Sequence, residues 1–266
     1  GPRLERALGE DFAPVMEAMR HRAPVFLRVN RMTLPEAQAL LRDDGIEAEP
    51  HPLADTALRV TAGARKVAAS RAYASGAVEL QDAASQAVVA ALPLADGQHV
   101  LDFCAGGGGK SLAMAARAKL RISAHDADPG RMRDLPARAA RAGVRIARVA
   151  TSEALDGRYD LVLTDVPCSG SGSWRRSPEG KWLLTEARLA ELVRLQAEIL
   201  DRTAPLVRAG GWLAYATCSM LEEENADQIN AFLSRHEGWE RGRSLSLTPL
   251  DGGDGFHLSL LARVRR

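Results

Sequence analysis

From about residue 80 onward, apolar residues follow two alternating patterns, short continuous runs and helical spacing. The runs predict strands at residues 99–105, 121–127, 145–151, 159–167, 212–219 and 256–264. The helical spacing predicts helices at residues 81–92, 110–118, 129–143, 186–211 and 221–238, the first of them amphipathic. Because strands and helices of these lengths alternate, we expect an α/β fold with a doubly wound, mostly parallel sheet covered by helices on both faces.

The first part of the chain has a different pattern, in which short apolar stretches are separated by turn signals. Its predicted elements are two strands at residues 24–30 and 57–61 and a helix at residues 33–45. The helix has Thr33 as its N-cap, Pro35 in its first turn and Gly45 as its C-cap. We therefore expect a small α+β module at residues 1–75 and a catalytic domain at residues 76–266. The formal charge of the module is nearly balanced, so its charge does not mark it as a binding domain. RNA binding by the module is left as an open alternative.

The composition is that of an ordinary globular protein, and it excludes several classes. With 46% apolar and 26% charged residues, the chain is not expected to be disordered, and no apolar run reaches the ~20 residues of a membrane span. Three widely spaced cysteines argue against a disulfide framework and predict a reducing, cytoplasmic location. A net charge of +1 excludes a strongly basic nucleic-acid binder, though not a local basic patch. The start Gly1-Pro2 is typical of a tag remnant and predicts that the chain belongs to a longer protein.

A glycine-rich loop, CAGGGGK at residues 104–110, joins a predicted strand to a predicted helix. Consecutive glycines let backbone N–H groups approach a ligand and point a helix N-terminus at it. The loop matches neither the G-x-G-x-x-G nor the Walker A pattern, and a tight turn without a ligand is the alternative. Asp126 ends the next predicted strand, where an acidic side chain can bind ribose hydroxyls. These features predict a nucleoside-bearing cofactor and leave open whether it is NAD or S-adenosylmethionine.

Two cysteine motifs follow two other predicted strands, TDVPCSGSG at residues 164–172 and YATCSMLEEEN at residues 215–225. Since the carboxyl ends of parallel strands share one edge of a sheet, both cysteines and the glycine loop are expected to converge on one crevice. Hydride transfer needs no such pair, whereas methylation of C5 of a pyrimidine needs a thiolate that adds to C6 and activates C5. The third cysteine, Cys104, is expected to be a buried packing residue. A zinc site from the cysteines and His125 lacks any C-x-x-C spacing, so no metal is expected.

From about residue 24 to residue 264, the chain resembles the RNA (cytosine-5) methyltransferases typified by the Sun/Fmu ribosomal RNA methyltransferases. The matching segments, in the order of the family, are LRVN, VELQDAASQ, LDFCAGGGGK, DVPCSGSG, WRRSPEGKW, LQAEIL and GGWLAYATCSMLEEEN. The resemblance implies a Rossmann-like methyltransferase fold. It also implies methyl transfer from S-adenosylmethionine to C5 of a cytosine in RNA, with S-adenosylhomocysteine as product. In such enzymes the residue matching Cys218 is the nucleophile that bonds to C6, Cys168 assists proton removal or product release, and Asp165 contacts the cytosine edge.

The resemblance also implies a cofactor site. Its residues would be Cys104, Ala105, Gly106, Gly107, Gly108, Gly109, Lys110, Asp126, Thr151 and Asp165. Two positions depart from the usual family pattern. Gly106 and Gly107 stand where Ala and Pro are common, and the extra glycine is expected to increase the ordering entropy lost on cofactor binding. Thr151 stands near the place of an acidic residue on the adenine side, so either its hydroxyl substitutes for the acid or the affinity for the cofactor is lower.

Basic residues beside tryptophans predict RNA contacts after the first cysteine motif. The residues expected to bind phosphates or bases are Arg175, Arg176 and Lys181. Trp174 and Trp182 flank this segment, and lid packing without RNA is the alternative for all of them. The acids in LEEEN at residues 221–225 are expected to start a helix rather than to take part in catalysis.

The substrate implied by the resemblance is ribosomal RNA. Transfer RNA is one alternative, and a catalytically weak RNA-binding or ribosome-assembly factor that keeps the fold is another. The presence of Cys168, Cys218 and Asp165 favours an enzyme over such a factor. We expect a monomer with no membrane partner.

Overall fold

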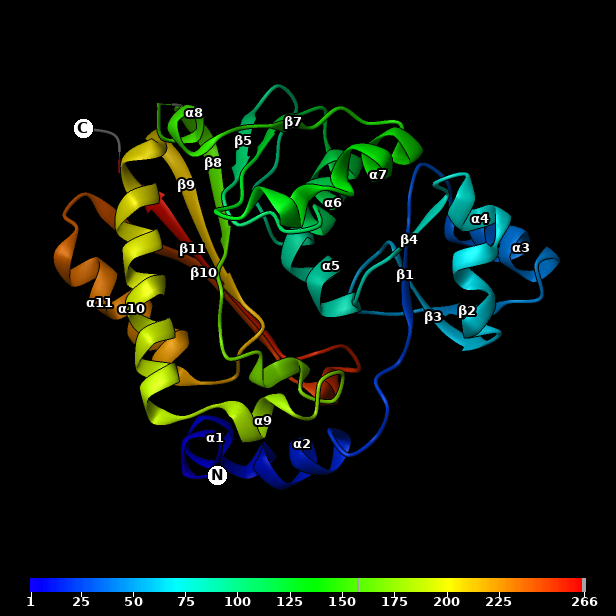
Figure 1. Cartoon of the computed structure of the whole chain (residues 1–266), viewed down its shortest axis with the longest axis horizontal. Helices are drawn as coiled ribbons and strands as arrows, with labels where there is room; N and C mark the ends of the chain where they lie inside the picture. Colours follow the sequence, from blue (N-terminus) through cyan, green and yellow to red (C-terminus); the bar gives the residue numbers. More distant parts are fainter. Residues whose placement is uncertain (157, 265–266) are drawn as a thin grey trace.

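The computed structural model of the chain describes residues 1–156 and 158–264. The chain begins with two short helices, α1 (Pro2–Leu8) and α2 (Phe12–Ala18), which a 3-10 turn, η1 (Gly9–Asp11), connects. Leu4 and Val15 of these helices pack against Leu189, Met220 and Leu221, which belong to the large domain described below. The two helices, which the sequence pattern did not predict, therefore cover the large domain, and in Figure 1 they lie along its lower edge, away from the small module.

A four-stranded antiparallel sheet forms the small module. Its elements in chain order are β1 (Phe26–Val29), α3 (Leu34–Asp43), β2 (Glu47–Pro50), β3 (Ala57–Ala62), η2 (Ala64–Ala69), α4 (Arg71–Ala74) and β4 (Val78–Leu80). The strand order is β2-β3-β1-β4, so the chain runs β-α-β-β-α-β. The predicted helix is confirmed with its N-cap, because the Thr33 hydroxyl accepts a hydrogen bond from the Glu36 amide and the Glu36 carboxylate accepts one from the Thr33 amide. The strands β2 and β4 were not predicted, and β4 extends the module beyond residue 75.

The large domain is built on a seven-stranded sheet, which confirms the predicted α/β fold. Its strands are β5 (His99–Asp102), β6 (Arg121–Ala124), β7 (Ala147–Arg148), β8 (Tyr159–Asp165), β9 (Val207–Thr217), β10 (Trp239–Leu247) and β11 (Phe256–Arg263). They are arranged in the order β10-β11-β9-β8-β5-β6-β7, and all neighbouring pairs from β9 to β7 are parallel. The strand β11 runs antiparallel between β9 and β10. The order reverses between β5 and β8, and in open α/β sheets the ligand crevice forms at this point.

Helices cover both faces of the large sheet (Figure 1). The helices are α5 (Ala83–Ala90), α6 (Gly109–Arg117), α7 (Leu135–Ala142), α8 (Thr151–Asp156), α9 (Gly180–Leu183), α10 (Glu186–Thr203) and α11 (Ala226–Arg235). Shorter 3-10 turns are η3 (Pro129–Met132), η4 (Ser171–Ser173), η5 (Ala204–Leu206), η6 (Glu222–Glu224) and η7 (Pro249–Asp251). Successive side chains of a strand point to opposite faces, so Leu161 and Leu163 of β8 pack with α5 and α6, whereas Val162 packs with α10 and α11.

The helix α5 is buried on all sides and is not the amphipathic helix that we predicted. Every residue from Ala83 to Val89 is buried. Ala83 packs against Phe26 and Ala57 of the module, and Val88 packs against the large sheet. Because the helix lies between two sheets, neither side of it faces water.

The structure differs from two further predictions, one for the end of α10 and one for the outer strand of the large sheet. The helix predicted for residues 186–211 ends at Thr203, where the chain continues as the 3-10 turn η5 with Ala204 still in helical backbone and Pro205, which lacks an amide donor, in the turn. The chain then enters β9 at Val207. The outer strand β10 had no predicted counterpart, since most of its residues are exposed and it carries no buried apolar pattern. Within the described ranges, no helix is long and apolar enough to cross a membrane.

Candidate active site at the carboxyl edge of the large sheet

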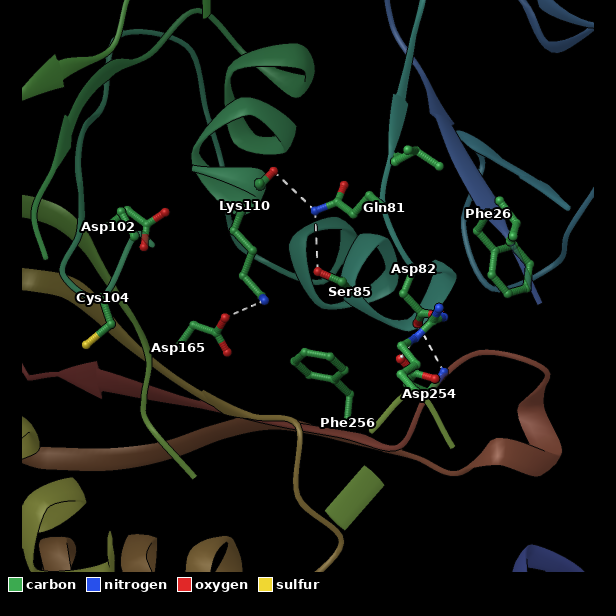
Figure 2. Close-up of a pocket in the computed structure, with 15 residues that line it drawn as sticks. Phe26, Gln81, Asp82, Ser85, Asp102, Cys104, Lys110, Asp165, Asp254 and Phe256 are labelled. Carbon is green, nitrogen blue, oxygen red and sulfur yellow. Dashed lines mark hydrogen bonds and ion pairs between the residues drawn. The ribbon is translucent and has the colours of Figure 1, made fainter. Parts of the chain in front are cut away.

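A cavity of about 480 Å³ lies between the module and the carboxyl ends of β5 and β8. It is lined by Val25, Phe26, Leu80, Gln81, Asp82, Ser85, Asp102, Cys104, Ala105, Gly109, Lys110, Asp165, Arg176, Asp254 and Phe256 (Figure 2). Cys104, Ala105, Gly109, Lys110 and Asp165 belong to the predicted cofactor site. The module supplies one wall through Val25, Phe26 and Leu80, although its sequence showed no sign of chemistry.

The glycine loop is held in place by hydrogen bonds. The Gly106 amide donates to Asp126 Oδ2 over 2.9 Å, and the Gly108 amide donates to the Ala105 carbonyl over 2.8 Å. The carbonyl of Gly107 accepts a hydrogen bond from Arg138. Gly108 has a left-handed backbone (φ 77°) and caps the start of α6. These bonds order the loop before any ligand binds.

Asp102, at the end of β5, is a buried carboxylate with one unpartnered oxygen. Its Oδ2 accepts a hydrogen bond of 2.6 Å from the Ser111 hydroxyl, while its Oδ1 has no hydrogen-bond partner. Burial raises the pKa of Asp102 to about 6, although the hydrogen bond from Ser111 acts in the opposite direction. Asp102 lines the cavity, and a buried oxygen without a donor fits a ligand that brings an N–H group.

Asp126 and Thr151 lie behind the glycine loop, outside the residues that line the cavity. The Asp126 carboxylate accepts hydrogen bonds from the amides of Gly106 and Asp128 and forms an ion pair with Arg131 at 3.3 Å. The Thr151 hydroxyl is 2.9 Å from Nε2 of the buried His125. His125, which we considered only as a metal ligand, thus holds Thr151, and its Nδ1 lies 2.7 Å from the Phe103 carbonyl oxygen. Among the described residues no cluster of metal ligands is found.

Lys110 and Asp165 form a short ion pair beside the cavity, where they point toward each other in Figure 2. The Lys110 ammonium is 2.6 Å from Asp165 Oδ2, and it also lies 4.7 Å from the centre of the Phe256 ring. Burial alone would lower the pKa of Lys110, but the charge of Asp165 and its hydrogen bond outweigh that effect and raise it. Lys110 therefore stays cationic, and Phe256 adds an aromatic surface that we did not predict.

The two motif cysteines meet at van der Waals distance. Cys168 Sγ and Cys218 Sγ are 3.4 Å apart, so the two cysteine loops converge as predicted, but neither cysteine is among the residues that line the cavity. A hydrogen bond from the Cys168 thiol lowers the pKa of Cys218; the charge of Lys110 adds to this effect, and burial and Asp165 oppose it. The pKa of Cys168 is raised well above its usual value by the same hydrogen bond and by burial. Cys218 is therefore the thiol of the pair that deprotonates first.

Cys104 differs from the other two cysteines. Burial, together with the charge of Asp102, raises the pKa of its thiol far above the usual value. Its side chain packs beside the cluster of apolar residues on the α10 side of the sheet. Cys104 has the properties of the packing residue that we expected, and it also lines the cavity.

The basic residues predicted to contact RNA lie in different environments. The Arg175 side chain is only 5% exposed, pairs with Asp254 at 2.9 Å and donates to the carbonyls of Gly252 and Gly253. It has no free surface for a phosphate, and we do not retain the RNA prediction for Arg175.

Arg176 and Lys181 are more accessible than Arg175. Arg176 is partly exposed and binds Asp254 and Asp82. Lys181 Nζ is 5.1 Å from the ring centre of Trp182, whose side chain is 80% exposed. These two basic residues and the exposed indole remain candidates for RNA contact.

In a comparison with known proteins, two domain families match this chain. A family described as 16S rRNA methyltransferase RsmB/F matches residues 89–259. A second, described as the ferredoxin-like domain of RsmF/B-like methyltransferases, matches residues 2–67. The ferredoxin-like description agrees with the β-α-β-β-α-β order of the small module.

Two curated relatives are similar to most of this chain. The ribosomal RNA small subunit methyltransferase B of Salmonella arizonae is 41% identical over 246 residues, covering 88% of this chain and 56% of the relative. The protein of the same name from Salmonella newport is 40% identical over 248 residues, with the same coverage. The chain therefore spans about half the length of these relatives.

Among solved structures, that of PH0851 has a TM-score of 0.90 at 29% identity, covering 98% of this chain and 64% of the other. The structure of NSun6 from Pyrococcus horikoshii with SFG has a TM-score of 0.87 at 16% identity and covers 100% of this chain and 97% of the other. At this identity the second match supports the fold alone.

Proposed function

The chain belongs to the RsmB/F family of 16S rRNA methyltransferases, and we propose that it methylates C5 of a cytosine in RNA, with ribosomal RNA as the substrate. The observation that carries the proposal is the pair of thiols 3.4 Å apart, in which Cys218 is the more acidic and the cation Lys110 lies nearby. Such a pair supplies one thiolate to attack the ring and one thiol to assist its release.

The family depends on S-adenosylmethionine, and the cavity has features that fit this molecule. Its unpartnered Asp102 oxygen can accept a hydrogen bond from the amino group of the methionine part. The loop from Cys104 to Lys110, with Asp165, would hold the rest of that part, and Asp126 and Thr151 would lie on the nucleoside side. When bound, S-adenosylmethionine supplies the methyl group.

The reaction on the base follows from the two thiols. The Cys218 thiolate forms a bond to C6, and the electrons of the C5–C6 double bond move to C5, which then takes the methyl group. A base, for which a water molecule at the site suffices, takes the C5 proton; the electrons of the C5–H bond restore the C5–C6 double bond, and the Cys218–C6 bond breaks to release the Cys218 thiolate. Cys168, in contact with Cys218, assists this last stage, and Asp165 binds the cytosine edge while Lys110 holds its carboxylate in place.

The target base must leave its stack to reach Cys218, which costs a few kcal/mol and is easiest in a loop or bulge of RNA. An exposed aromatic side chain can compensate by stacking on a neighbouring base. Trp182, with Lys181 beside its ring, offers such a surface on α9. We assign these two residues to RNA contact.

The test uses the purified protein, labelled S-adenosylmethionine and bulk RNA. We expect 5-methylcytosine to form with the wild type and to be absent with Cys218→Ala. With Cys168→Ala, we expect a covalent protein–RNA adduct that resists denaturation, because release from C6 is impaired.

Cofactor binding should be measured first by calorimetry, because it depends on the cavity and not on RNA recruitment by other parts of a longer protein. A wild-type protein that does not bind S-adenosylmethionine at millimolar concentration would contradict the enzyme proposal. Unchanged methylation by Cys218→Ala would contradict the assignment of the nucleophile.

A further inference from the structure

Glu224 is a fully buried carboxylate (0% exposed) that has no basic ion-pair partner in the described part of the chain. A buried charge of this kind must be stabilised by hydrogen bonds. Its Oε1 accepts from the Ser169 amide over 2.8 Å and from the Gln196 side chain over 3.0 Å. Its Oε2 accepts from the hydroxyls of Ser169 and Ser219, each over 2.5 Å.

Two of the three residues that donate to Glu224 directly follow the two motif cysteines. Ser169 follows Cys168, and Ser219 follows Cys218. One carboxylate therefore holds the backbone loops of both cysteines. A second link runs between the same loops, because the Gly172 amide donates to the Cys218 carbonyl over 2.9 Å.

The charges around the two thiols are arranged asymmetrically. Glu224, on η6, acts on Cys168, whereas Lys110, on α6, acts on Cys218 together with the opposing charge of Asp165 on β8. A further titratable group near the pair is Tyr215 on β9. Burial raises its pKa well above the usual value, so it stays neutral. The carboxylate of Glu224 thus adds to the effects that raise the pKa of Cys168.

We propose that Glu224 is a positioning residue that makes the two thiols unequal: it holds both cysteine loops through Ser169 and Ser219, and it places a negative charge against the loop of Cys168, so that Cys218 is the nucleophile. The proposal rests on the proposed function for the roles of the thiols. The asymmetry itself is a property of the protein without RNA or cofactor, and it can be measured in that form.

The test is the rate at which iodoacetamide alkylates each cysteine, followed by peptide mass mapping between pH 6 and pH 9. In the wild type we expect Cys218 to react faster than Cys168. In Glu224→Gln the negative charge is lost while the size is kept, so we expect the ratio of the two rates to fall by about tenfold, the change in thiolate fraction that one pKa unit produces.

The control is Glu222→Gln, which removes an exposed charge from the same turn and should leave the ratio unchanged. A role limited to general stability would increase both alkylation rates in parallel. An unchanged ratio in a folded Glu224→Gln protein, or a parallel increase, would overturn the proposal.

A second measurement needs no change at Glu224 and so applies even if Glu224→Gln does not fold. In Cys218→Ala and Cys168→Ala, one motif thiol remains, and its pKa follows from the pH dependence of its alkylation. We expect the lone Cys168 to titrate at higher pH than the lone Cys218. The reverse order, or equal values, would refute the electrostatic role of Glu224.

Because this assay requires no methyl transfer, a failure of the proposed function would appear separately, as a lack of 5-methylcytosine beside an intact thiol asymmetry.

Discussion

Three carboxylates at or behind the candidate active site, Asp102, Asp165 and Glu224, are each held by a different kind of donor. Asp165 is paired with the ammonium of Lys110. Both carboxylate oxygens of Glu224 accept hydrogen bonds from hydroxyl and amide donors. Asp102 accepts one hydrogen bond from a hydroxyl, and its other oxygen has no hydrogen-bond partner. Charged partners favour the ionised form, whereas burial with few donors disfavours it. These environments fix Asp165 against a cation, hold Glu224 behind the two thiols and leave Asp102 with an open acceptor on the cavity wall.

The raised pKa of Asp102 predicts a pH-dependent stability. Its pKa is about 6 in the folded protein against 3.8 as the usual value, so the folded state binds this proton more tightly. The folded state therefore loses stability as the pH rises from about 4 to about 6. Asp102→Asn removes this effect, and we expect it to gain up to about 3 kcal/mol relative to wild type between pH 4 and pH 7.

Urea unfolding of both proteins at the two pH values measures this gain. Asp227→Asn, at an exposed position of α11, is the matched control and should show no such trend. A difference in unfolding free energy between Asp102→Asn and wild type that stays constant with pH would contradict the prediction.

At the scale of elements, the ends of three parallel strands deliver the chemistry. The chain leaves β5 into the glycine loop, β8 into Asp165 and Cys168, and β9 into Cys218. The helix α6 begins at Gly109, and its N-cap Gly108 has a left-handed backbone that turns the chain from loop to helix. An ideal Cβ at Gly108 would lie 2.2 Å from Leu135 Cδ1, so both the backbone and the packing at this point require glycine.

Alanine substitutions can separate these two requirements. Gly97 also has positive φ (85°), but nothing lies within 4 Å of its ideal Cβ. We expect Gly97→Ala to cost about 1–2 kcal/mol for the backbone alone. Gly108→Ala should cost more by about 1–3 kcal/mol, because Leu135 must also move. Chemical unfolding measures both values, and equal costs would show that Leu135 yields without strain.

At the scale of the whole molecule, a partly buried network of ion pairs joins the parts that enclose the cavity. Arg175 and Arg176, from the segment after the first cysteine motif, both bind Asp254 in the turn before β11. Arg176 also reaches Asp82 at the start of α5 and the Pro24 carbonyl before β1. The network thus ties the module, α5 and the catalytic loops into one enclosure.

Removal of Arg175 should therefore weaken the fold rather than RNA binding alone. It leaves Asp254 without one of its two arginines in a buried site, and we expect Arg175→Ala to destabilise the protein by about 3–5 kcal/mol. Arg188→Ala, which breaks an exposed pair with Glu191, should cost no more than about 1 kcal/mol. Thermal unfolding tests both. An Arg175→Ala protein of wild-type stability that no longer binds RNA would restore the original RNA prediction.

The local sequence pattern was sufficient to predict the features that depend on burial and on the direction of the strands. Continuous apolar runs mark strands buried on both faces, so the pattern predicted β5, β8 and β9 and the convergence of the two cysteine motifs at their ends. The N-cap at Thr33 was equally visible, because capping depends on residues only three positions apart. The edge strand β10 was missed, since an exposed strand has no buried apolar pattern to report.

By itself, the sequence determined the α/β architecture and the three loops that carry the chemistry, because periodicity reports which residues are buried and parallel strands share one edge. Only the tertiary structure decided which distant segments meet. It brought Phe26 of the module to the cavity wall, buried Arg175 against Asp254, and set Glu224 behind both cysteines. Contacts across such sequence separations depend on how whole elements pack, and no local pattern encodes them.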